Sequence, residues 1–207
     1  MEHTILSAKA GHHSRPIKDA GLPEVIGNFA IGVGSVKKQH VVVDIHIREN
    51  GITRQLSRTG ARIIGVDRYG AKGGGSASED NCPIAFGRSA NGLTLPIEAH
   101  SVDVVFMDLV LHHFQTPSLA IAEAKRVLRP GGRLVITDIQ KYNHAGAKEA
   151  WEDRWMGLYP GDIRHWLKVE GFSNIIVNPV PTRQVCSDSA CLDENRTAGY
   201  LMATGTA

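Results

Sequence analysis

The sequence predicts an α/β fold, a Rossmann-like three-layer sandwich built on a mostly parallel sheet. Three observations support this prediction. Short runs of β-branched and other apolar residues recur along the chain, as expected for strands that are buried on both faces. Segments with helical periodicity lie between several of these runs, and such alternation is typical of parallel sheets. Glycine and proline stand at the ends of the segments, where turns are needed.

The first two strands are predicted at residues 41–45 (VVVDI) and 61–67 (ARIIGVD). Residues 52–60 between them have a helical pattern, and Gly60 is suited to the left-handed backbone that often follows a helix. The crossover of this β-α-β unit is expected to be right-handed, with a ligand crevice beyond the carboxyl ends of the strands. Short apolar groups divided by glycine and proline predict an N-terminal extension of helices and loops over residues 1–40. Residues 41–207 form the predicted domain.

The same alternation continues in the second half of the chain. Strands are predicted at residues 102–108 (VDVVFMD) and 133–139 (RLVITDI), with a helix at 119–128 that stops at the Pro-Gly-Gly of residues 130–132. A later helix over residues 160–172 precedes strands at 175–180 and 198–205. No helix separates these last two strands, so an antiparallel hairpin is expected. Residues 68–80 are rich in glycine and serine and predict a mobile loop beside the crevice.

Composition narrows the class of protein. A chain of 207 residues with 42% hydrophobic and 21% charged residues fits one globular domain. A net charge of +2 gives no reason to expect nucleic acid or an anionic membrane as partner, and a small-molecule substrate is expected instead. Three cysteines do not form a disulfide framework, and the first residues lack an apolar signal core, so a cytoplasmic location is expected. No apolar run approaches the ~20 residues that span a bilayer, so no membrane is expected as partner.

Residues 93–139 carry the most specific pattern, LTLPIEAHSVDVVFMDLVLHHFQTPSLAIAEAKRVLRPGGRLVITDI. This stretch resembles the class I S-adenosylmethionine-dependent methyltransferases, particularly the branch that acts on quinones, lipids and other small molecules. The resemblance implies a seven-stranded sheet with an antiparallel C-terminal hairpin. It also implies S-adenosylmethionine as cofactor and methyl transfer to a small-molecule acceptor.

The resemblance assigns cofactor-binding roles to four residues. Asp44 matches the acidic residue that ends the first strand and orients the glycine loop or the methionine amine, although a strand-end aspartate also caps turns. Asp67 matches the acidic residue that accepts the ribose hydroxyls, and a carboxylate can accept two such bonds at once. Asn91 stands at the position of the adenine contact, and Leu109 near the backbone contacts to the cofactor.

The glycine loop departs from the pattern of the family. The family has D-x-G-x-G-x-G, whereas His46, Arg48 and Asn50 occupy the three glycine positions here. Positive φ costs a non-glycine residue roughly 1–2 kcal/mol, and these side chains project toward the cofactor space. Arg48 also suits a carboxylate or a phosphate, with a solvated charge on the loop as the alternative. Two hypotheses follow: an S-adenosylmethionine-binding enzyme that uses these loop residues, or a non-catalytic or repurposed protein of the same fold that does not bind this cofactor.

Two adjacent histidines follow the predicted strand at residues 102–108. Imidazole titrates near neutrality, so His113 is the predicted general base. The alternative is that one of His112 and His113 packs in the core and the other lines the crevice. No third ligand with metal-like spacing accompanies them, and Cys186 and Cys191 do not complete a four-ligand zinc set, so no metal is predicted. Three tryptophans at residues 151–166 leave both a substrate lid and core packing open.

Overall fold

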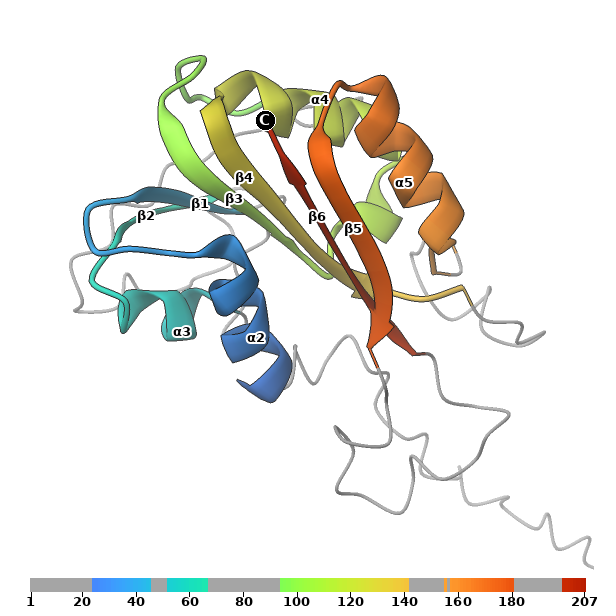
Figure 1. The fold of residues 1–207 in the computed structure, drawn as a ribbon, viewed down its shortest axis with the longest axis horizontal. Coiled ribbons are helices and arrows are strands. Elements are labelled where there is room, and N and C mark those ends of the chain that lie inside the picture. The colour runs from blue at the N-terminus through green and yellow to red at the C-terminus, as the bar shows by residue number, and fades with distance from the viewer. Residues whose placement is uncertain (1–23, 46–51, 67–93, 142–154, 156, 181–198) are drawn as a thin grey trace, which may run out of the picture.

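A computed structural model describes residues 24–45, 52–66, 94–141, 155, 157–180 and 199–207. The described residues form one six-stranded sheet in the order β2-β1-β3-β4-β6-β5 (Figure 1). Strands β2, β1, β3 and β4 are parallel, and β6 is antiparallel to both of its neighbours. The strand bounds are Val41–Ile45 (β1), Arg62–Val66 (β2), Val102–Asp108 (β3), Leu128–Ile139 (β4), Ser173–Val180 (β5) and Tyr200–Thr206 (β6).

The mostly parallel α/β sheet and its antiparallel C-terminal hairpin are confirmed, but the expected count of seven strands is wrong for the described part of the chain. Apolar periodicity identifies the same six strands in the sequence, and the seventh was implied by the family resemblance alone. Residues 68–80 are rich in glycine and small polar residues, which do not supply the apolar surface of a buried strand. These residues, which are the predicted mobile loop, lie outside the described part of the chain.

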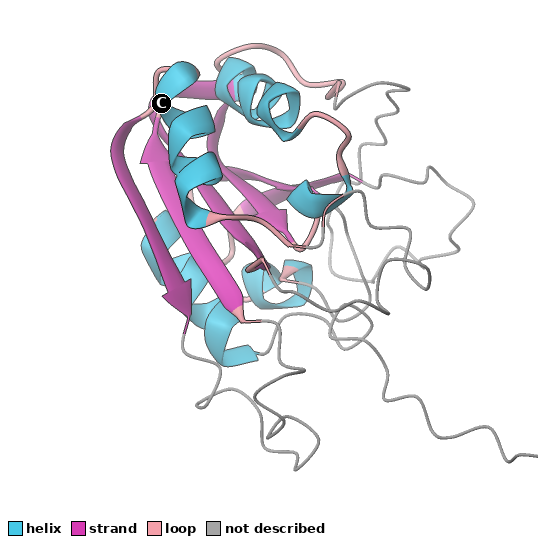
Figure 2. Ribbon diagram, turned by 90° about the vertical axis from the view of Figure 1, so that its right-hand side faces the viewer, coloured by secondary structure: helices cyan, strands magenta, loops and turns pink. Residues whose placement is uncertain are grey.

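Helices cover both faces of the sheet (Figures 1 and 2). One face carries α2 (Glu24–Gly34) and α3 (Thr53–Ser57), and the other carries α4 (Pro117–Val127) and α5 (Pro160–Val169). A single 3-10 turn, η1 (Leu111–His113), follows β3. Helix α2 lies within the segment that the sequence assigns to an N-terminal extension. Its Ile26 and Ala30 are buried in the core between the sheet and α2–α3.

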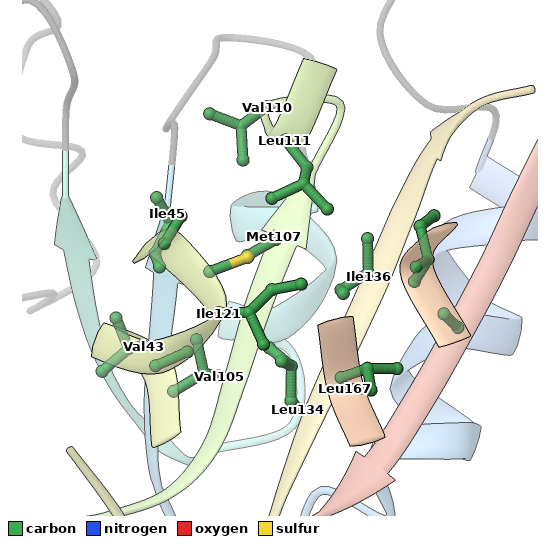
Figure 3. Close-up of a cluster of buried hydrophobic side chains, with 14 of the residues drawn as sticks. Val43, Ile45, Val105, Met107, Val110, Leu111, Ile121, Leu134, Ile136 and Leu167 are labelled. Carbon is green, nitrogen blue, oxygen red and sulfur yellow. The ribbon is translucent and has the colours of Figure 1, made fainter. Parts of the chain in front are cut away.

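Two hydrophobic cores result, one on each face of the sheet. Figure 3 shows the core between the sheet and α4–α5, where side chains of β1, β3 and β4 meet Ile121 of α4 and Leu167 of α5. The second core contains Phe106 and Val135 of the sheet beneath α2 and α3. Alternating residues of the same strand enter different cores, which explains why these strands are apolar throughout.

The Pro-Gly-Gly of residues 130–132 lies inside β4, which corrects the expectation that it separates a helix from a strand. Helix α4 ends at Val127 and the strand begins at Leu128. The strand then bulges, because Leu128 pairs with Val102 whereas Arg133 pairs with Val104. Gly131, with φ 81°, provides the left-handed backbone within this bulge.

The outer edge of β5 is covered by a side chain from α5. Arg164 donates hydrogen bonds to the carbonyl oxygens of Ile175 and Val177, so these two residues direct their polar backbone groups away from β6. Pro179 has the same parity along the strand, and its missing N–H therefore falls on the edge that has no partner strand among the described residues.

Candidate functional site

The carboxyl ends of three adjacent parallel strands each carry a buried aspartate. Asp44 lies near the end of β1, Asp108 ends β3, and Asp138 lies near the end of β4. All three side chains are at most 5% exposed. Carboxyl ends of parallel strands meet at one edge of a sheet, which is where α/β proteins of this kind bind ligands. Three buried carboxyl groups therefore lie at the edge of the sheet where the crevice is predicted.

Asp44 is held by α3 on one side only. The hydroxyl of Thr53 donates to Oδ2, whereas Oδ1 accepts no hydrogen bond from any described residue. Burial raises the pKa of Asp44, the Thr53 hydrogen bond opposes this, and the charge of Asp108 raises it further, to about 7. A positive charge near Asp44 would therefore lower its pKa and favour its ionised form.

Thr137 of β4 makes two hydrogen bonds to the end of β3, one with Asp108 and one with Leu109. The Thr137 hydroxyl donates to Asp108 Oδ1 at 2.8 Å, and the Leu109 N–H donates to the Thr137 carbonyl oxygen at 2.8 Å. Leu109 has a φ of 49°, an unfavourable value for a branched side chain, and it is 1% exposed. Strained backbone of this kind persists where the surroundings over-determine it, and it is common at binding sites.

Asp138 fixes η1 through a set of hydrogen bonds. Its Oδ2 accepts the N–H groups of Leu111 and His112 at 2.9 and 3.2 Å, and its Oδ1 lies 2.5 Å from His112 Nδ1. A carboxylate is an acceptor, so the imidazole carries its hydrogen on Nδ1 toward Asp138. His112 and Asp138 are both fully buried, and the pair sets both the backbone and the ring orientation of the turn.

His113 ends this turn, and Trp155 is hydrogen-bonded to its backbone. The His113 ring is half-buried, with its centroid 4.0 Å from that of His112. Trp155 donates its backbone N–H to the His112 carbonyl oxygen at 3.3 Å and its indole N–H to the Phe114 carbonyl oxygen at 2.9 Å. Its ring also meets Trp166 of α5 edge to face. Trp155 therefore ties the histidine turn to the α5 side of the sheet.

Three of the predicted site residues lie within the described part of the chain: Asp44, Leu109 and His113. The structure brings them to the same edge of the sheet, at the ends of β1 and β3. The other predicted cofactor residues lie outside the described residues, namely His46, Arg48, Asn50, Asp67 and Asn91.

Sequence reasoning missed Asp108 and Asp138 as site residues. The family resemblance singled out Asp44 and Asp67. An aspartate at or next to the end of an apolar run, as in VDVVFMD and VITDI, is the signal that could have found the other two. The described residues contain no group of three or more His, Cys, Asp or Glu side chains arranged to hold a metal ion. No helix among them has the length and apolar character needed to cross a membrane.

Comparisons with known proteins agree with this architecture. A family model described as a methyltransferase domain matches residues 44–136. The ubiquinone/menaquinone biosynthesis C-methyltransferase UbiE of Saccharophagus degradans is 25% identical over 66% of this chain and 57% of its own length. Over these residues the chain is similar to methyltransferase domains. It spans about half of the length of the curated relatives that it matches, or less.

Solved structures of the methyltransferase fold align along most of the chain. Phosphoethanolamine N-methyltransferase 2 of Haemonchus contortus, solved with S-adenosylhomocysteine, gives a TM-score of 0.69 at 16% identity, over 89% of this chain and 53% of that chain. The [4+2]-cyclase SpnF gives a TM-score of 0.65 at 16% identity, over 88% of this chain and 79% of that chain. At this level of identity the likeness shows the fold and leaves the reaction open.

Proposed function

We propose that this protein binds S-adenosylmethionine at the acidic edge of the sheet and transfers its methyl group to a small-molecule acceptor. The observation that carries the proposal is the buried carboxyl of Asp44, which lies at the end of the first strand and whose Oδ1 accepts no hydrogen bond from the described residues. A buried polar atom without a partner is costly unless a ligand supplies one.

The described residues fit the charge of this cofactor. S-adenosylmethionine carries a sulfonium and an ammonium group, and a cation beside the buried Asp44 carboxyl would stabilise its ionised form and lower its pKa. When bound, the cofactor supplies an electrophilic methyl group. Asp44 is the described residue that would hold its positive end, with Asp67 and Asn91 as the proposed ribose and adenine contacts.

The remaining residues position the acceptor side. Asp138 and Trp155 hold η1 in one conformation, and this fixes the backbone of His113, whose two ring nitrogens are buried. We propose His113 as the group that removes a proton from an acceptor that must lose one. Direct displacement at a methyl group depends mainly on proximity and alignment, so a rigid turn contributes more than the base itself.

A second candidate is a protein of this fold that has lost or changed the cofactor. It is favoured by the three replaced glycine positions, where His46, Arg48 and Asn50 have larger side chains than the glycines of the family. The fold-level likeness to a [4+2]-cyclase is compatible with a different reaction in the same crevice.

Calorimetry of the purified protein with S-adenosylmethionine and S-adenosylhomocysteine tests the two candidates. The proposed function predicts binding by the wild-type protein, weakened by about 1–3 kcal/mol in Asp67→Ala through loss of charge-assisted hydroxyl bonds. The second candidate predicts no binding by the wild-type protein at millimolar ligand. If side-chain volume is the obstacle, the triple variant His46→Gly, Arg48→Gly, Asn50→Gly gains binding.

A further inference from the structure

The outer edge of β5, beside α5 in Figure 1, is open to regular strand pairing over only two residues. Ile175 and Val177 direct their backbone groups away from β6, and no strand among the described residues pairs with that side. Before them, Asn174 has a left-handed φ of 49°, and the register with β6 shifts. After them, Pro179 has the same parity along the strand but no N–H to donate. Pairing with another strand at this edge therefore depends on Ile175 and Val177.

Arg164 of α5 occupies the two carbonyl oxygens that such pairing needs. Its guanidinium group donates to the carbonyl oxygens of Ile175 and Val177, with both distances at 3.4 Å. The side chain is exposed, and it forms no ion pair with an acidic side chain of the described residues. Hydrogen bonds of this length contribute little to the stability of the fold, whereas a cation lying across an edge strand obstructs the approach of another strand.

The strand that matches this edge is β5 of a second copy of the chain. Two identical antiparallel strands are related by a two-fold axis, the commonest symmetry of protein dimers. With the axis at Ile176, Ile175 of one copy lies opposite Val177 of the other, and the ladder uses the carbonyl oxygens that Arg164 holds. The Ile176 side chain is 56% exposed, and pairing would cover it with its symmetry mate. The same axis brings two Arg164 side chains to one edge, where like charges repel.

We propose that Arg164 keeps the outer edge of β5 from pairing with the same edge of a second copy. It holds the two acceptors that the ladder requires, and it places a positive charge where its symmetry mate would lie. Edge strands pair readily with one another unless a charge, a proline or a bulge prevents it. This role of Arg164 is independent of the cofactor and the reaction proposed for the crevice.

Sedimentation equilibrium of the wild-type protein and two variants tests the proposal. Arg164→Ala removes both the hydrogen bonds and the charge. Lys168→Ala is the matched control, because it removes an exposed positive charge one turn further along α5. Arg164→Ala is expected to self-associate at least about tenfold more tightly than wild type, and Lys168→Ala is expected to match wild type. Equal association constants for all three proteins refute the proposal.

A disulfide at residue 176 locates the interface. Residues that lie opposite each other without sharing hydrogen bonds in an antiparallel pair have Cα atoms about 4.5 Å apart, within the range of a disulfide. Ile176→Cys is expected to crosslink two copies when combined with Arg164→Ala, and not when Arg164 is present. Peptide mapping assigns the bond to residue 176. Self-association of Arg164→Ala without this crosslink, or equal crosslinking in both backgrounds, would overturn the proposal.

Hydrogen exchange of the wild-type protein decides the question even if Arg164→Ala does not fold. The outward N–H groups of Ile175 and Val177 are expected to exchange at a rate that does not depend on protein concentration, because no second copy protects them. Slower exchange of these two groups at high protein concentration would mean that the edge pairs despite Arg164, and the proposal would then be wrong.

Discussion

Asp44 shows how one buried carboxyl links stability to pH. Its pKa rises from 3.8 to about 7, first because burial penalises the charged form and then because Asp108 lies nearby, with the Thr53 hydrogen bond in opposition. Between these two pH values the folded protein keeps a proton that the unfolded chain has released. The free energy of unfolding therefore decreases as pH rises from about 4 to 7 and is constant above this range as far as Asp44 is concerned.

Asp44→Asn removes this dependence, because an amide of the same shape does not ionise. Relative to wild type, the variant is expected to be more stable at pH 8 than at pH 4.5 by on the order of 2–4 kcal/mol. Urea unfolding at the two pH values measures the difference. Asp103→Asn serves as the control, because Asp103 lies near the start of β3, away from Asp44, and binds Arg129. A pH dependence of Asp44→Asn equal to that of wild type would mean that Asp44 is ionised in the folded protein at both values.

At the scale of elements, the end of β4 organises the site. Thr137 braces the turn after β3, and Asp138 binds the backbone and the ring of η1. Two consecutive residues point to opposite faces of a strand, so one strand end supports both Asp108 and the histidine turn η1. This arrangement explains why His112 is buried while His113 is half-buried beside it.

Apolar periodicity was sufficient to predict the strands, because every strand of the parallel sheet is buried and reads as a continuous apolar run. It located β1 and β3 to the residue and α5 to within its final turn. It missed the bulge in β4, because pairing with Ala207 and Val102 decides the backbone of residues 128–132, and neither is a sequence neighbour. Asp138 was missed for the same reason, since its partners precede it by 26 and 27 residues.

Gly157 lies shortly before α5, and both its backbone conformation and its close contact with the end of β4 require glycine. It has a φ of 71°, and a Cβ there would lie 2.5 Å from the Gln140 carbonyl oxygen. Its neighbour Leu158 bridges to the end of β4, with its N–H donating to the Ile139 carbonyl oxygen at 2.8 Å. Any side chain at residue 157 therefore strains the contact between this segment and the sheet.

Gly157→Ala is expected to lower the free energy of unfolding by about 2–3 kcal/mol, from positive φ and overpacking together. Gly161→Ala is the matched control, because no heavy atom lies within 4 Å of a Cβ there and the residue is in the first turn of α5. The control is expected to be neutral or stabilising by up to about 1 kcal/mol. Chemical denaturation of both variants measures this, and equal stability of the two would contradict the packing described for Gly157.

For the whole molecule, β6 is the strand that holds the two parts of the sheet together. It lies between β4 and β5 and is antiparallel to both, so it joins the parallel part of the sheet to the edge strand. Its Leu201 and Ala203 are buried in the α4–α5 core, while Tyr200 and Met202 enter the opposite core. Both hydrophobic cores therefore depend on one seven-residue strand.

Proline substitutions compare this interior strand with the edge strand β5. Ala203→Pro removes a ladder hydrogen bond in the interior of the sheet and is expected to cost more than about 3 kcal/mol, enough to unfold a marginally stable domain. Ile175→Pro removes an N–H from the outward side of β5, where Pro179 is already accommodated, and is expected to cost about 1–2 kcal/mol less than the change in β6. Circular dichroism and thermal unfolding compare them, and equal tolerance at the two positions would contradict the sheet order.

The central position of β6 also orders events during translation. Residues 200–206 leave the ribosome after every other strand of the described sheet, although their partners in β4 begin at Arg133 and end at Ile139. Until then β4 has an open edge and β5 has no partner strand among the described residues. The nascent chain consequently exposes an unpaired hydrophobic strand for much of its synthesis, the state in which chains aggregate or engage chaperones. A stop codon before residue 200 would therefore release a polypeptide with an incomplete sheet, destined for proteolysis whatever the condition of its binding crevice.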